Sequence, residues 1–457
     1  MFKSMNNKRI DNIINELVDQ YTYADTSERP WIIGFSGGKD STVLLTLVWR
    51  ALEKIKKEFP APFQLRRPVY VVCNDTMVEN PIISEYVDDV LTKIGQAARE
   101  QNLPIFIKKT IPKIESTFWV NVLGKGYPVP NNSFRWCTDK LKIRPTSAFI
   151  TEQIDEKGEA IILIGTRNAE SASRARSIKK HEIKGKRLTK HPNHHNTLVY
   201  SPIKELMLEE VWYIINAMPS PWGYDNTKLF QIYADASADD YECPTVVTNK
   251  THSSCGKSRF GCWTCTVVKE DKSMTALIKS GQDWMQPLLK FRDNLEKDRN
   301  ISDNRLATRR NGQKAVTEDG HKQGNYTPEY RARLLRELLE IQKHIQETKP
   351  RVELITNQEL IAIQVFWYRD GIFDFKVGNI YANIFGKEIE TENSNIESSV
   401  EKRLLRNVCE NNEDDYSLIK NLLSLQHSKT LLLSKYGLQN DIENSIERFV
   451  KENNNEN

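Results

Sequence analysis

Apolar residues along the first 220 positions recur with two different spacings. Short apolar runs predict five buried strands, at residues 31–36, 69–74, 104–109, 161–166 and 197–203. Apolar residues at helical spacing predict helices at residues 1–20, 41–55, 83–101 and 206–218, with another beyond Pro145. Strands that alternate with helices in this way are typical of an α/β domain with a parallel sheet.

The pattern changes after Pro219. Residues 219–270 are rich in Pro, Gly, Cys and Trp and show little periodicity, and residues 293–327 form a polar stretch that predicts a loop. Further helices are predicted at residues 275–292, 328–347, 359–371 and 400–451. We therefore expect three parts: an α/β domain at 1–240, a cysteine-rich module at 241–300, and a mainly helical region at 301–457 with a disordered end.

Length and charge narrow the class of protein. A chain of 457 residues is long enough for two or three domains. No apolar run approaches the roughly 18 residues of a spanning helix, and no signal peptide is apparent, so we expect a cytoplasmic protein without a membrane partner. The net charge is only +4, but residues 174–191 carry eight Lys or Arg against one Glu, which suggests a basic working face.

Four of the seven cysteines fall within residues 243–265. They are Cys243, Cys255, Cys262 and Cys265, and the last two form a C-x2-C pair. Four thiolates fit either tetrahedral zinc or an iron–sulfur cluster, and unrelated buried cysteines are the simplest alternative. We expect Cys73 to be a core residue and Cys409 to be incidental.

A glycine turn, SGGKDS (36–41), lies between the first predicted strand and the helix that follows it. Adjacent glycines let a backbone approach an anion closely, and free N–H groups at a helix start favour phosphate. Lys39 adds a point charge, Asp40 can hold Mg²⁺ or order the loop, and Ser41 can donate to a phosphate oxygen. The turn is not a Walker A loop, because Asp40 follows Lys39. The plain alternative is an ordinary tight turn.

Polar residues also follow the second predicted strand. Asp75, Thr76 and Glu79 stand where open α/β sheets bind ligands, and they could contact a ribose, an adenine or Mg²⁺. The alternative is that Asp75 or Thr76 simply caps the next helix.

A cysteine surrounded by cations, and a cluster of arginines, are further candidates. Cys137 is surrounded in the sequence by Arg135, Lys140, Lys142 and Arg144. Cations near a thiol favour the thiolate, which suits a sulfur carrier or a cluster ligand. The segment GTRNAESASRARS after the fourth strand carries Arg167, Arg174 and Arg176, whose forks match phosphate or sulfate. An incidental cysteine and a solvated arginine face are the alternatives.

Downstream basic residues could follow a phosphate backbone or could be ordinary solvated charge. They are Arg305, Arg309, Arg310, Lys314, Arg331, Arg333 and Arg336. Only Tyr326 and Tyr330 lie nearby for base stacking.

The motifs together resemble known sulfur enzymes. GFSGGKDSTVLL resembles the pyrophosphate loop of the N-type ATP pyrophosphatases, which split ATP between its α and β phosphates. The R-x-C-T…K…P and G-x-R-x-x-E-S-x-x-R-A segments resemble PAPS (3′-phosphoadenylylsulfate) reductase-like proteins. With SPIKELMLEEVWYIIN, RFGCWTC and GNYTPEYRARLLRELL, residues from about 20 to 345 resemble the DndC family, the ATP-pyrophosphatase component of bacterial DNA phosphorothioation.

The resemblance implies a Rossmann-like fold of the adenine-nucleotide α-hydrolase type. It implies ATP-dependent sulfur insertion into the DNA backbone, with ATP, Mg²⁺ and a [4Fe–4S] cluster as cofactors. The implied partners are DNA, a cysteine desulfurase and other phosphorothioation proteins.

The candidate residues divide into three expected roles in this reaction. The catalytic candidates are Lys39, Asp40, Ser41, Cys137, Lys142, Arg167 and Arg174. Nucleotide contacts are expected from Ser36, Gly37, Gly38, Lys39, Asp40, Ser41, Asp75 and Thr76. Cluster ligands are expected from Cys243, Cys255, Cys262 and Cys265, with Cys137 as a substitute ligand or as a free persulfide carrier.

Three other functions remain open at this stage. A tRNA-thiolating enzyme would act on a base, and a PAPS-type reductase would act on a small sulfonucleotide. A nucleotide-gated scaffold for a desulfurase would need no catalysis, but it would also have no need to keep Lys39 and Asp40.

Overall fold

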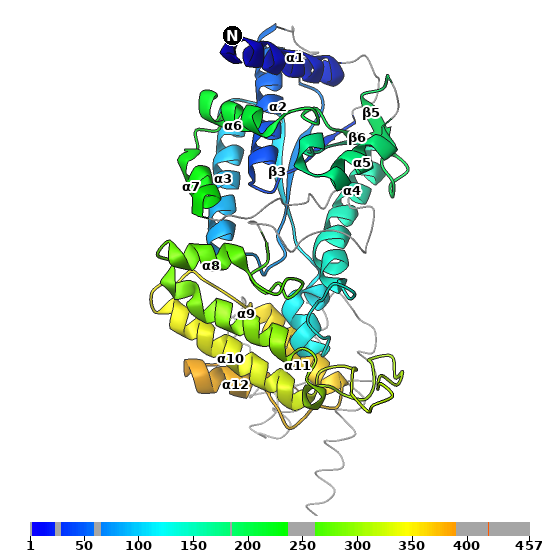
Figure 1. The fold of residues 1–457 in the computed structure, drawn as a ribbon, viewed down its shortest axis with the longest axis vertical. Coiled ribbons are helices and arrows are strands. Elements are labelled where there is room, and N and C mark those ends of the chain that lie inside the picture. The colour runs from blue at the N-terminus through cyan, green and yellow to red at the C-terminus, as the bar shows by residue number, and fades with distance from the viewer. Residues whose placement is uncertain are drawn as a thin grey trace, which may run out of the picture. The chain divides into compact units, whose positions relative to one another are not determined.

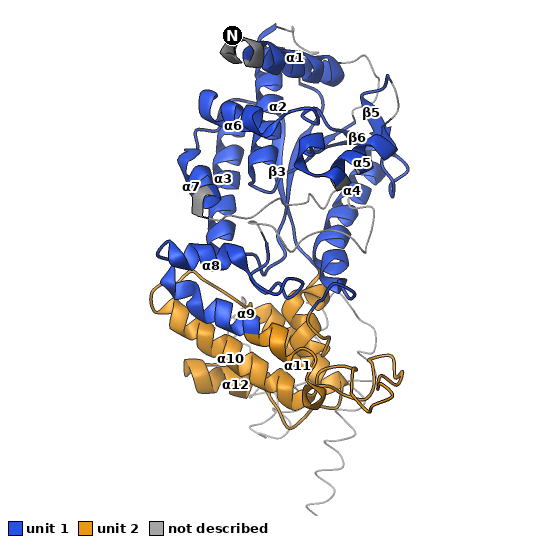
Figure 2. Ribbon diagram, viewed as in Figure 1, with its two compact units in different colours: residues 1–112, 130–293 blue, residues 113–129, 294–457 orange. Residues whose placement is uncertain are grey.

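A computed structural model describes residues 2–22, 29–58, 65–182, 185–235 and 261–389, together with Ile419. The described chain divides into two compact units, shown in separate colours in Figure 2. Unit 1 comprises residues 1–112 and 130–293, and unit 2 comprises residues 113–129 and 294–457. The predicted helix at 400–451 lies outside the described residues except for Ile419.

Unit 1 is built on a six-stranded sheet (Figure 1) with the order β3-β2-β1-β4-β6-β5. The strands are β1 (Trp31–Gly34), β2 (Val69–Asn74), β3 (Ile105–Thr110), β4 (Ala160–Leu163), β5 (Leu188–Lys190) and β6 (Thr197–Tyr200). All neighbours are parallel except β5, which runs antiparallel to β6. Strand β1 pairs with β2 on one side and with β4 on the other, and its Trp31 lies opposite Val69 and Ile161. Strands β2 and β3 therefore extend the sheet from one side of β1, and β4 and the later strands extend it from the other side. The direction of strand addition reverses between β1 and β4. Open α/β sheets bind ligands at the carboxyl ends of the strands at such a reversal.

Both faces of the sheet are buried. One face packs with α1 (Phe2–Thr22), α2 (Lys39–Glu58), α3 (Pro81–Glu100) and α6 (Leu208–Ala217) around Ile33, Val71 and Leu163. The opposite face holds Ile32, Val72 and Ile162 against Phe149 and Ile150 of α4 (Arg144–Lys157). Burial on both sides explains why these strands are continuous apolar runs in the sequence.

The five predicted strands and the helices between them are confirmed, with differences elsewhere. Strand β5 and helix α5 (Ala172–His181) lie within the basic stretch, and α7 (Thr227–Asp235) lies in the segment of little periodicity. The single helix predicted at 275–292 is wrong. Two helices, α8 (Lys272–Lys279) and α9 (Gln286–Asp298), occur instead, because Gly281 adopts a φ of +102° between them.

The described part of unit 2 is mainly helical, and it includes an early segment of the chain. Its helices are α10 (Pro328–Gln346), α11 (Asn357–Arg369) and α12 (Val377–Phe385), together with the π-helix Val120–Gly124. The Trp119 indole donates to the Leu354 carbonyl at 2.7 Å, and the Trp367 indole donates to the Leu123 carbonyl at 2.7 Å. Both indoles are fully buried, so residues 113–129 contribute to the core of unit 2.

Among the described residues, no helix combines the length and the apolar character that a membrane crossing requires.

Candidate functional site

The anion loop (residues 36–41) joins β1 to the first turn of α2. The backbone amides of Ser36, Gly38 and Lys39 each donate to a hydroxyl oxygen, at 3.3, 3.3 and 3.2 Å. These distances are at the long end of the hydrogen-bond range. Amides at a helix start attract anions, and an oxyanion accepts more strongly than a neutral hydroxyl. The loop therefore has three donors whose present partners a phosphate could replace.

Asp40 is held between two cations. Its Oδ2 lies 3.1 Å from the Lys39 ammonium, and its Oδ1 accepts from Arg167 Nε at 2.7 Å. Arg167 is 2% exposed, and its Nη1 also donates to the Leu206 carbonyl at 3.2 Å. The loop after β4 thus fixes the carboxylate of the loop after β1, a pairing that motif spacing could not predict.

Gly165 permits this contact between the two loops. A Cβ atom at this position would lie 3.0 Å from the Asp40 carbonyl oxygen and 3.3 Å from the Ser41 nitrogen. Any larger residue would force the start of α2 away from the loop that carries Arg167.

The other two arginines of this segment differ from Arg167. Arg174 forms a half-buried ion pair with Glu170, whose pKa is raised by burial against the lowering effect of that arginine. Arg176 is exposed and donates to the carbonyl of Ala172, one turn earlier in α5. Arg174 and Arg176 remain predicted anion ligands, whereas Arg167 has a clear structural link to Asp40.

Tyr233 of α7 is a residue that the sequence analysis missed. Its hydroxyl accepts from the Lys39 amide at 3.2 Å, and its ring centroid lies 5.3 Å from the Lys39 ammonium. Trp212 packs edge-on against the same ring at 5.2 Å. The segment showed little helical periodicity, so no signal in the sequence marked this tyrosine.

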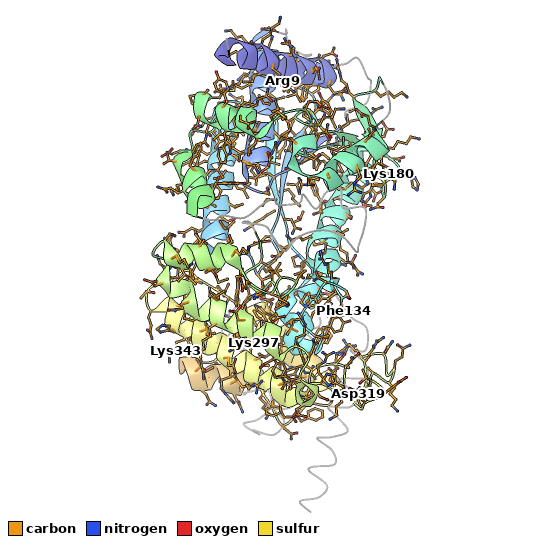
Figure 3. All side chains as sticks on the ribbon, viewed as in Figure 1. Arg9, Phe134, Lys180, Lys297, Asp319 and Lys343 are labelled. Carbon is orange, nitrogen blue, oxygen red and sulfur yellow. The ribbon has the colours of Figure 1, made fainter. Side chains whose placement is uncertain are left out.

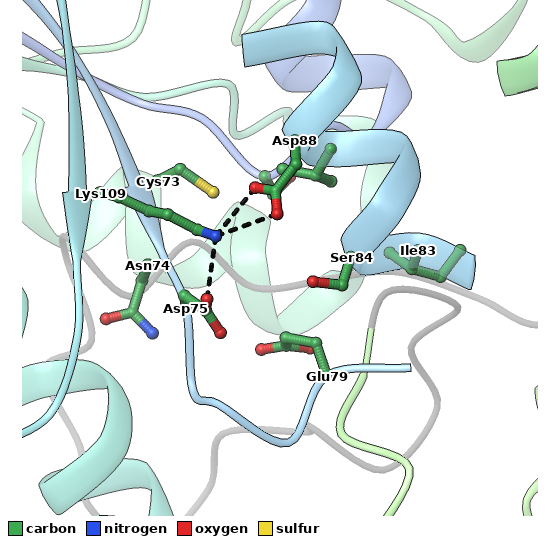
Figure 4. Close-up of a pocket in the computed structure, with 10 residues that line it drawn as sticks. Cys73, Asn74, Asp75, Glu79, Ile83, Ser84, Asp88 and Lys109 are labelled. Carbon is green, nitrogen blue, oxygen red and sulfur yellow. Dashed lines mark hydrogen bonds and ion pairs between the residues drawn. The ribbon is translucent and has the colours of Figure 1, made fainter. Parts of the chain in front are cut away.

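A small pocket, partly open to solvent, lies beside the anion loop at the ends of β2 and β3 (Figure 4). It is lined by Ser36, Cys73, Asn74, Asp75, Glu79, Ile83, Ser84, Val87, Asp88 and Lys109. The Lys109 ammonium lies 3.0 Å from Asp75 Oδ2 and 2.8 Å from Asp88 Oδ1. Burial lowers the pKa of Lys109, but the two carboxylates outweigh it and raise that pKa. The sequence analysis did not name Lys109. The available signal was a pair of lysines at the end of the otherwise apolar run 104–109.

Neither Asp75 nor Thr76 caps the following helix. Asn80 is the N-cap of α3 and accepts from the amide of Ile82 at 3.1 Å. Asp75 Oδ1 instead accepts from the Met77 amide at 2.8 Å, and Thr76 donates to Glu79 at 2.8 Å. The capping alternative is therefore wrong for both residues. Cys73 is buried in β2, as predicted.

The cysteine loop (residues 261–266) docks on the segment after β2. The Asn80 amide donates to the Gly261 carbonyl at 3.2 Å, and the Trp263 amide donates to the Val78 carbonyl at 3.0 Å. Cys262 Sγ lies 3.3 Å from the Thr76 hydroxyl oxygen. One of the two C-x2-C thiols is thus at the carboxyl edge of the sheet, next to a predicted nucleotide contact.

The segment that carries Cys137 borders the same region. Thr266 donates to the Pro130 carbonyl at 2.7 Å, and Asn74 donates to the Leu141 carbonyl at 3.1 Å. Cys137 is half-buried, just before the π-helix Thr138–Ile143.

The charges around Cys262 act on its pKa in opposite directions. Burial and the Glu79 carboxylate raise the pKa of the Cys262 thiol, whereas the charge of Lys142 lowers it.

Arg292 is a second residue that the sequence analysis missed. It is fully buried in α9 and donates to the carbonyls of Cys265 at 2.8 Å, Lys269 at 2.6 Å and Val268. An arginine four residues after Leu288 lies on the apolar stripe of the helix, and this position was the available signal. Arg292 fixes the chain that leaves the cysteine loop.

The cysteine site can be compared with its prediction only in part. Cys265 donates its amide to the Cys262 carbonyl at 3.1 Å, so the two thiols lie on one tight turn. Cys243 and Cys255 lie outside the described residues. Within the described ranges, no group of three or more His, Cys, Asp and Glu side chains is positioned to hold a metal ion. A pair of thiols on one turn fits half of a four-thiolate site.

Several downstream basic residues have internal roles in unit 2. Arg305 is buried and donates to the carbonyls of Gly324 and Arg299, at 2.6 and 2.8 Å. Arg310 forms a two-bond ion pair with Asp370, and buried Arg331 donates to the Gly124 carbonyl at 2.7 Å. Tyr326 and Tyr330 are buried against each other. These residues stabilise unit 2, whereas Arg309, Lys314 and Arg336 are exposed.

Sequence comparison gives the family. Residues 30–268, just over half of the chain, match the phosphoadenosine phosphosulfate reductase domain. The chain belongs to the phosphoadenosine phosphosulfate reductase domain family. With the mostly parallel sheet, this membership confirms the predicted α/β fold of the adenine-nucleotide α-hydrolase type.

Individual relatives of this reductase-domain chain are distant. An uncharacterised protein of Methanocaldococcus jannaschii is 30% identical over 179 residues, which are 39% of this chain and 28% of that protein. The chain therefore spans little more than a quarter of that relative.

Two solved structures show weak likeness to the chain. The PAPS reductase of Candida auris, in a phosphate complex, is 13% identical with a TM-score of 0.29, covering 49% of this chain and 90% of that one. The U34-tRNA thiolase NcsA of Methanococcus maripaludis, with its [4Fe–4S] cluster, is 13% identical with a TM-score of 0.28, covering 64% and 79%.

Proposed function

We propose that the protein is an ATP pyrophosphatase and sulfurtransferase that inserts sulfur into the DNA backbone, as the DndC family does. The observation that carries this proposal is that the anion loop and a cysteine thiol lie at the same edge of the sheet. The anion loop follows β1, and a thiol of the C-x2-C pair lies 3.3 Å from Thr76, just after the neighbouring strand β2. The DNA acceptor rests on the resemblance of the combined motifs to DndC.

In the first step, a non-bridging oxygen of a DNA phosphate attacks the α-phosphorus of ATP. The bond between that phosphorus and the α–β bridging oxygen breaks, and pyrophosphate leaves. The amides of Ser36, Gly38 and Lys39 donate hydrogen bonds to the departing pyrophosphate, whose developing negative charge the Lys39 ammonium also stabilises. Arg167 holds Asp40 in place, and Asp40 orients Lys39.

In the second step, a persulfide on Cys137, supplied by a cysteine desulfurase, attacks the activated DNA phosphorus and AMP leaves. A second thiolate then attacks the Cys137 sulfur, which releases the phosphorothioate and leaves a disulfide for a cellular reductant to reopen. Lys142 contributes positive charge near the Cys262 thiol.

Two further cofactors belong to this proposal. Mg²⁺ would be bound through Asp40 or Asp75, whose oxygens now contact Lys39, Arg167 and Lys109. Cys262 and Cys265, with Cys243 and Cys255, would bind a [4Fe–4S] cluster, which supplies a site where sulfur can bind or electrons can pass. Other phosphorothioation proteins would act in the same reaction.

Mass spectrometry of digested nucleic acid tests the acceptor. We expect Asp40→Ala cells, compared with cells carrying the intact gene cluster, to lose phosphorothioate-linked dinucleotides from their DNA. Asp89→Ala removes an exposed carboxylate of α3 and should leave them unchanged. Loss of a thionucleoside from tRNA would point to a tRNA thiolase. No change in either nucleic acid would contradict the proposal and favour a small-molecule reductase or a scaffold.

Tyr233→Phe is expected to tighten the binding of inorganic pyrophosphate by about five- to tenfold, measured by titration calorimetry. In the wild type an anion must replace the tyrosine hydroxyl at the Lys39 amide, and the variant removes that competitor, worth about 1 kcal/mol. Tyr213→Phe, whose hydroxyl contacts Asn7 on the surface, is the matched control. Weaker binding by Tyr233→Phe would mean that the hydroxyl donates to the anion instead.

A further inference from the structure

The stretch between Arg305 and Tyr326, expected to be a loop, is a small β-meander (residues 305–326). Isolated antiparallel bridges join Arg305 to Tyr326, Thr308 to Lys314 and Val316 to Lys322. The Ala315 amide donates to the Ala307 carbonyl at 2.7 Å, and the Gln323 amide donates to the Ala315 carbonyl at 2.7 Å. Three short extended segments therefore lie side by side in a defined register.

Two tight turns of the same kind connect these segments. Each turn is closed by a backbone hydrogen bond between residues four positions apart. The Arg309 amide donates to the Gln313 carbonyl at 2.8 Å, and the Thr317 amide donates to the His321 carbonyl at 3.0 Å. Gly312 and Gly320 take up positive φ values of 80° and 82° at the third position of each turn. Three-residue hairpins of this form need such a residue, and Asn-Gly and Asp-Gly supply it here.

Two arginines fix the meander to unit 2. Arg305 holds its base through the carbonyls of Gly324 and Arg299, and its guanidinium lies 5.5 Å from the Tyr326 ring centroid. Arg310, at the first turn, pairs with Asp370 and donates to the Lys125 carbonyl at 3.2 Å. The meander is thus anchored at both its base and its first turn.

Three other cations of the meander have no such role. Arg309, Lys314 and Lys322 are exposed, and their side chains make no hydrogen bond or ion pair within the described part of the chain. The acidic residues Glu318 and Asp319, the latter labelled in Figure 3, lie at the second turn. Cations therefore gather at the first turn and at the central and third segments, on a backbone that is already ordered.

We infer that this meander is a surface of unit 2 that binds the phosphate backbone of duplex DNA through Arg309, Lys314 and Lys322. The inference rests on the proposed DNA acceptor and adds where that substrate is held. An ordered surface loses little entropy on binding. Each of the two hairpins is a two-stranded ribbon, which fits the wide major groove of B-form DNA better than the deep, narrow groove of A-form RNA. Each cation would replace a counterion at one phosphate.

The test measures binding of a 30-base-pair DNA duplex by the full-length protein at several salt concentrations. Arg309→Gln/Lys314→Gln/Lys322→Gln should weaken binding at least about tenfold and reduce the slope of log K against log salt by about three. Lys93→Gln/Lys290→Gln/Lys376→Gln removes three exposed lysines elsewhere whose side chains also make no hydrogen bond or ion pair with a described residue, and it should keep the wild-type slope. Thermal unfolding of both variants should match the wild type, because the six side chains are exposed.

The failures of the two proposals are distinguishable. Wild-type binding to the duplex with an unchanged slope in the meander variant would overturn the inference and leave the DNA acceptor standing. A wild-type protein without measurable duplex binding would instead count against the DNA acceptor. A slope that falls for a tRNA hairpin but not for the duplex would overturn the inference in favour of an RNA surface.

Discussion

Arg167→Lys is expected to lower the kcat of the proposed pyrophosphate release from ATP at least about a hundredfold, with a smaller change in KM. The arginine donates at once to Asp40 and to the Leu206 carbonyl from a nearly inaccessible position. A lysine has one compact donor group and cannot make both bonds with the same geometry. Asp40 and Lys39 would shift, and a displacement of about 1 Å at a reacting centre costs roughly two orders of magnitude in rate.

Arg99→Lys is the matched control for this variant. It makes the same chemical change on α3 of unit 1, where the arginine side chain is exposed and has no part in the candidate site. We expect activity within about twofold of the wild type, since surface substitutions of this kind have small effects. Equal activities of the two variants would show that the link from Arg167 to Asp40 does not position the reacting groups.

Arg292→Met is expected to lower the local stability of residues 262–270 by about 3 kcal/mol. Methionine can fill much of the buried volume but cannot donate to the carbonyls of Cys265, Val268 and Lys269. These carbonyls are only partly buried, so the loss of each hydrogen bond costs about 1 kcal/mol, and the three losses add to about 3 kcal/mol. Amide hydrogen exchange in peptides covering 262–270 should therefore accelerate about a hundredfold.

The control for Arg292→Met is on the same helix. Lys290 is exposed in α9, so Lys290→Met changes the same charge without removing a buried donor. Its exchange in 262–270 should remain at the wild-type rate. Unchanged exchange in Arg292→Met would mean that the cysteine loop holds its conformation without the arginine.

The sheet was predictable because its strands are buried on both faces and so appear as continuous apolar runs. Strand β5 has only three residues, Leu188–Lys190, and none is fully buried, so it lacks that signal. The membership of residues 113–129 in unit 2 was also hidden, because it depends on indole hydrogen bonds to carbonyls more than 200 positions away. Such pairings depend on tertiary structure and leave no local periodicity.

The candidate site was predictable as a set of loops but not as a set of contacts. Residue types indicated an anion loop at 36–41 and thiols at 262 and 265, yet nothing in their spacing linked Arg167 to Asp40 or Cys262 to Thr76. The basic residues at 305–336 show that residue type alone does not distinguish a structural cation from an exposed one. Arg309 and Arg310 are neighbours of identical type, but among the residues that the structure describes only Arg310 has an acidic partner, Asp370.

The insertion of residues 113–129 into unit 2 has a consequence for how this protein can evolve and be divided. The chain passes between the units three times, at 112–113, 129–130 and 293–294. A gene break at 293 would therefore leave a fragment that still carries Trp119 and Leu123 but has lost their partners Leu354 and Trp367. Such a fragment would keep one part of the core of unit 2 without the rest. Exchange of unit 2 between proteins would require two segments of the chain, 113–129 and 294–457, and not one.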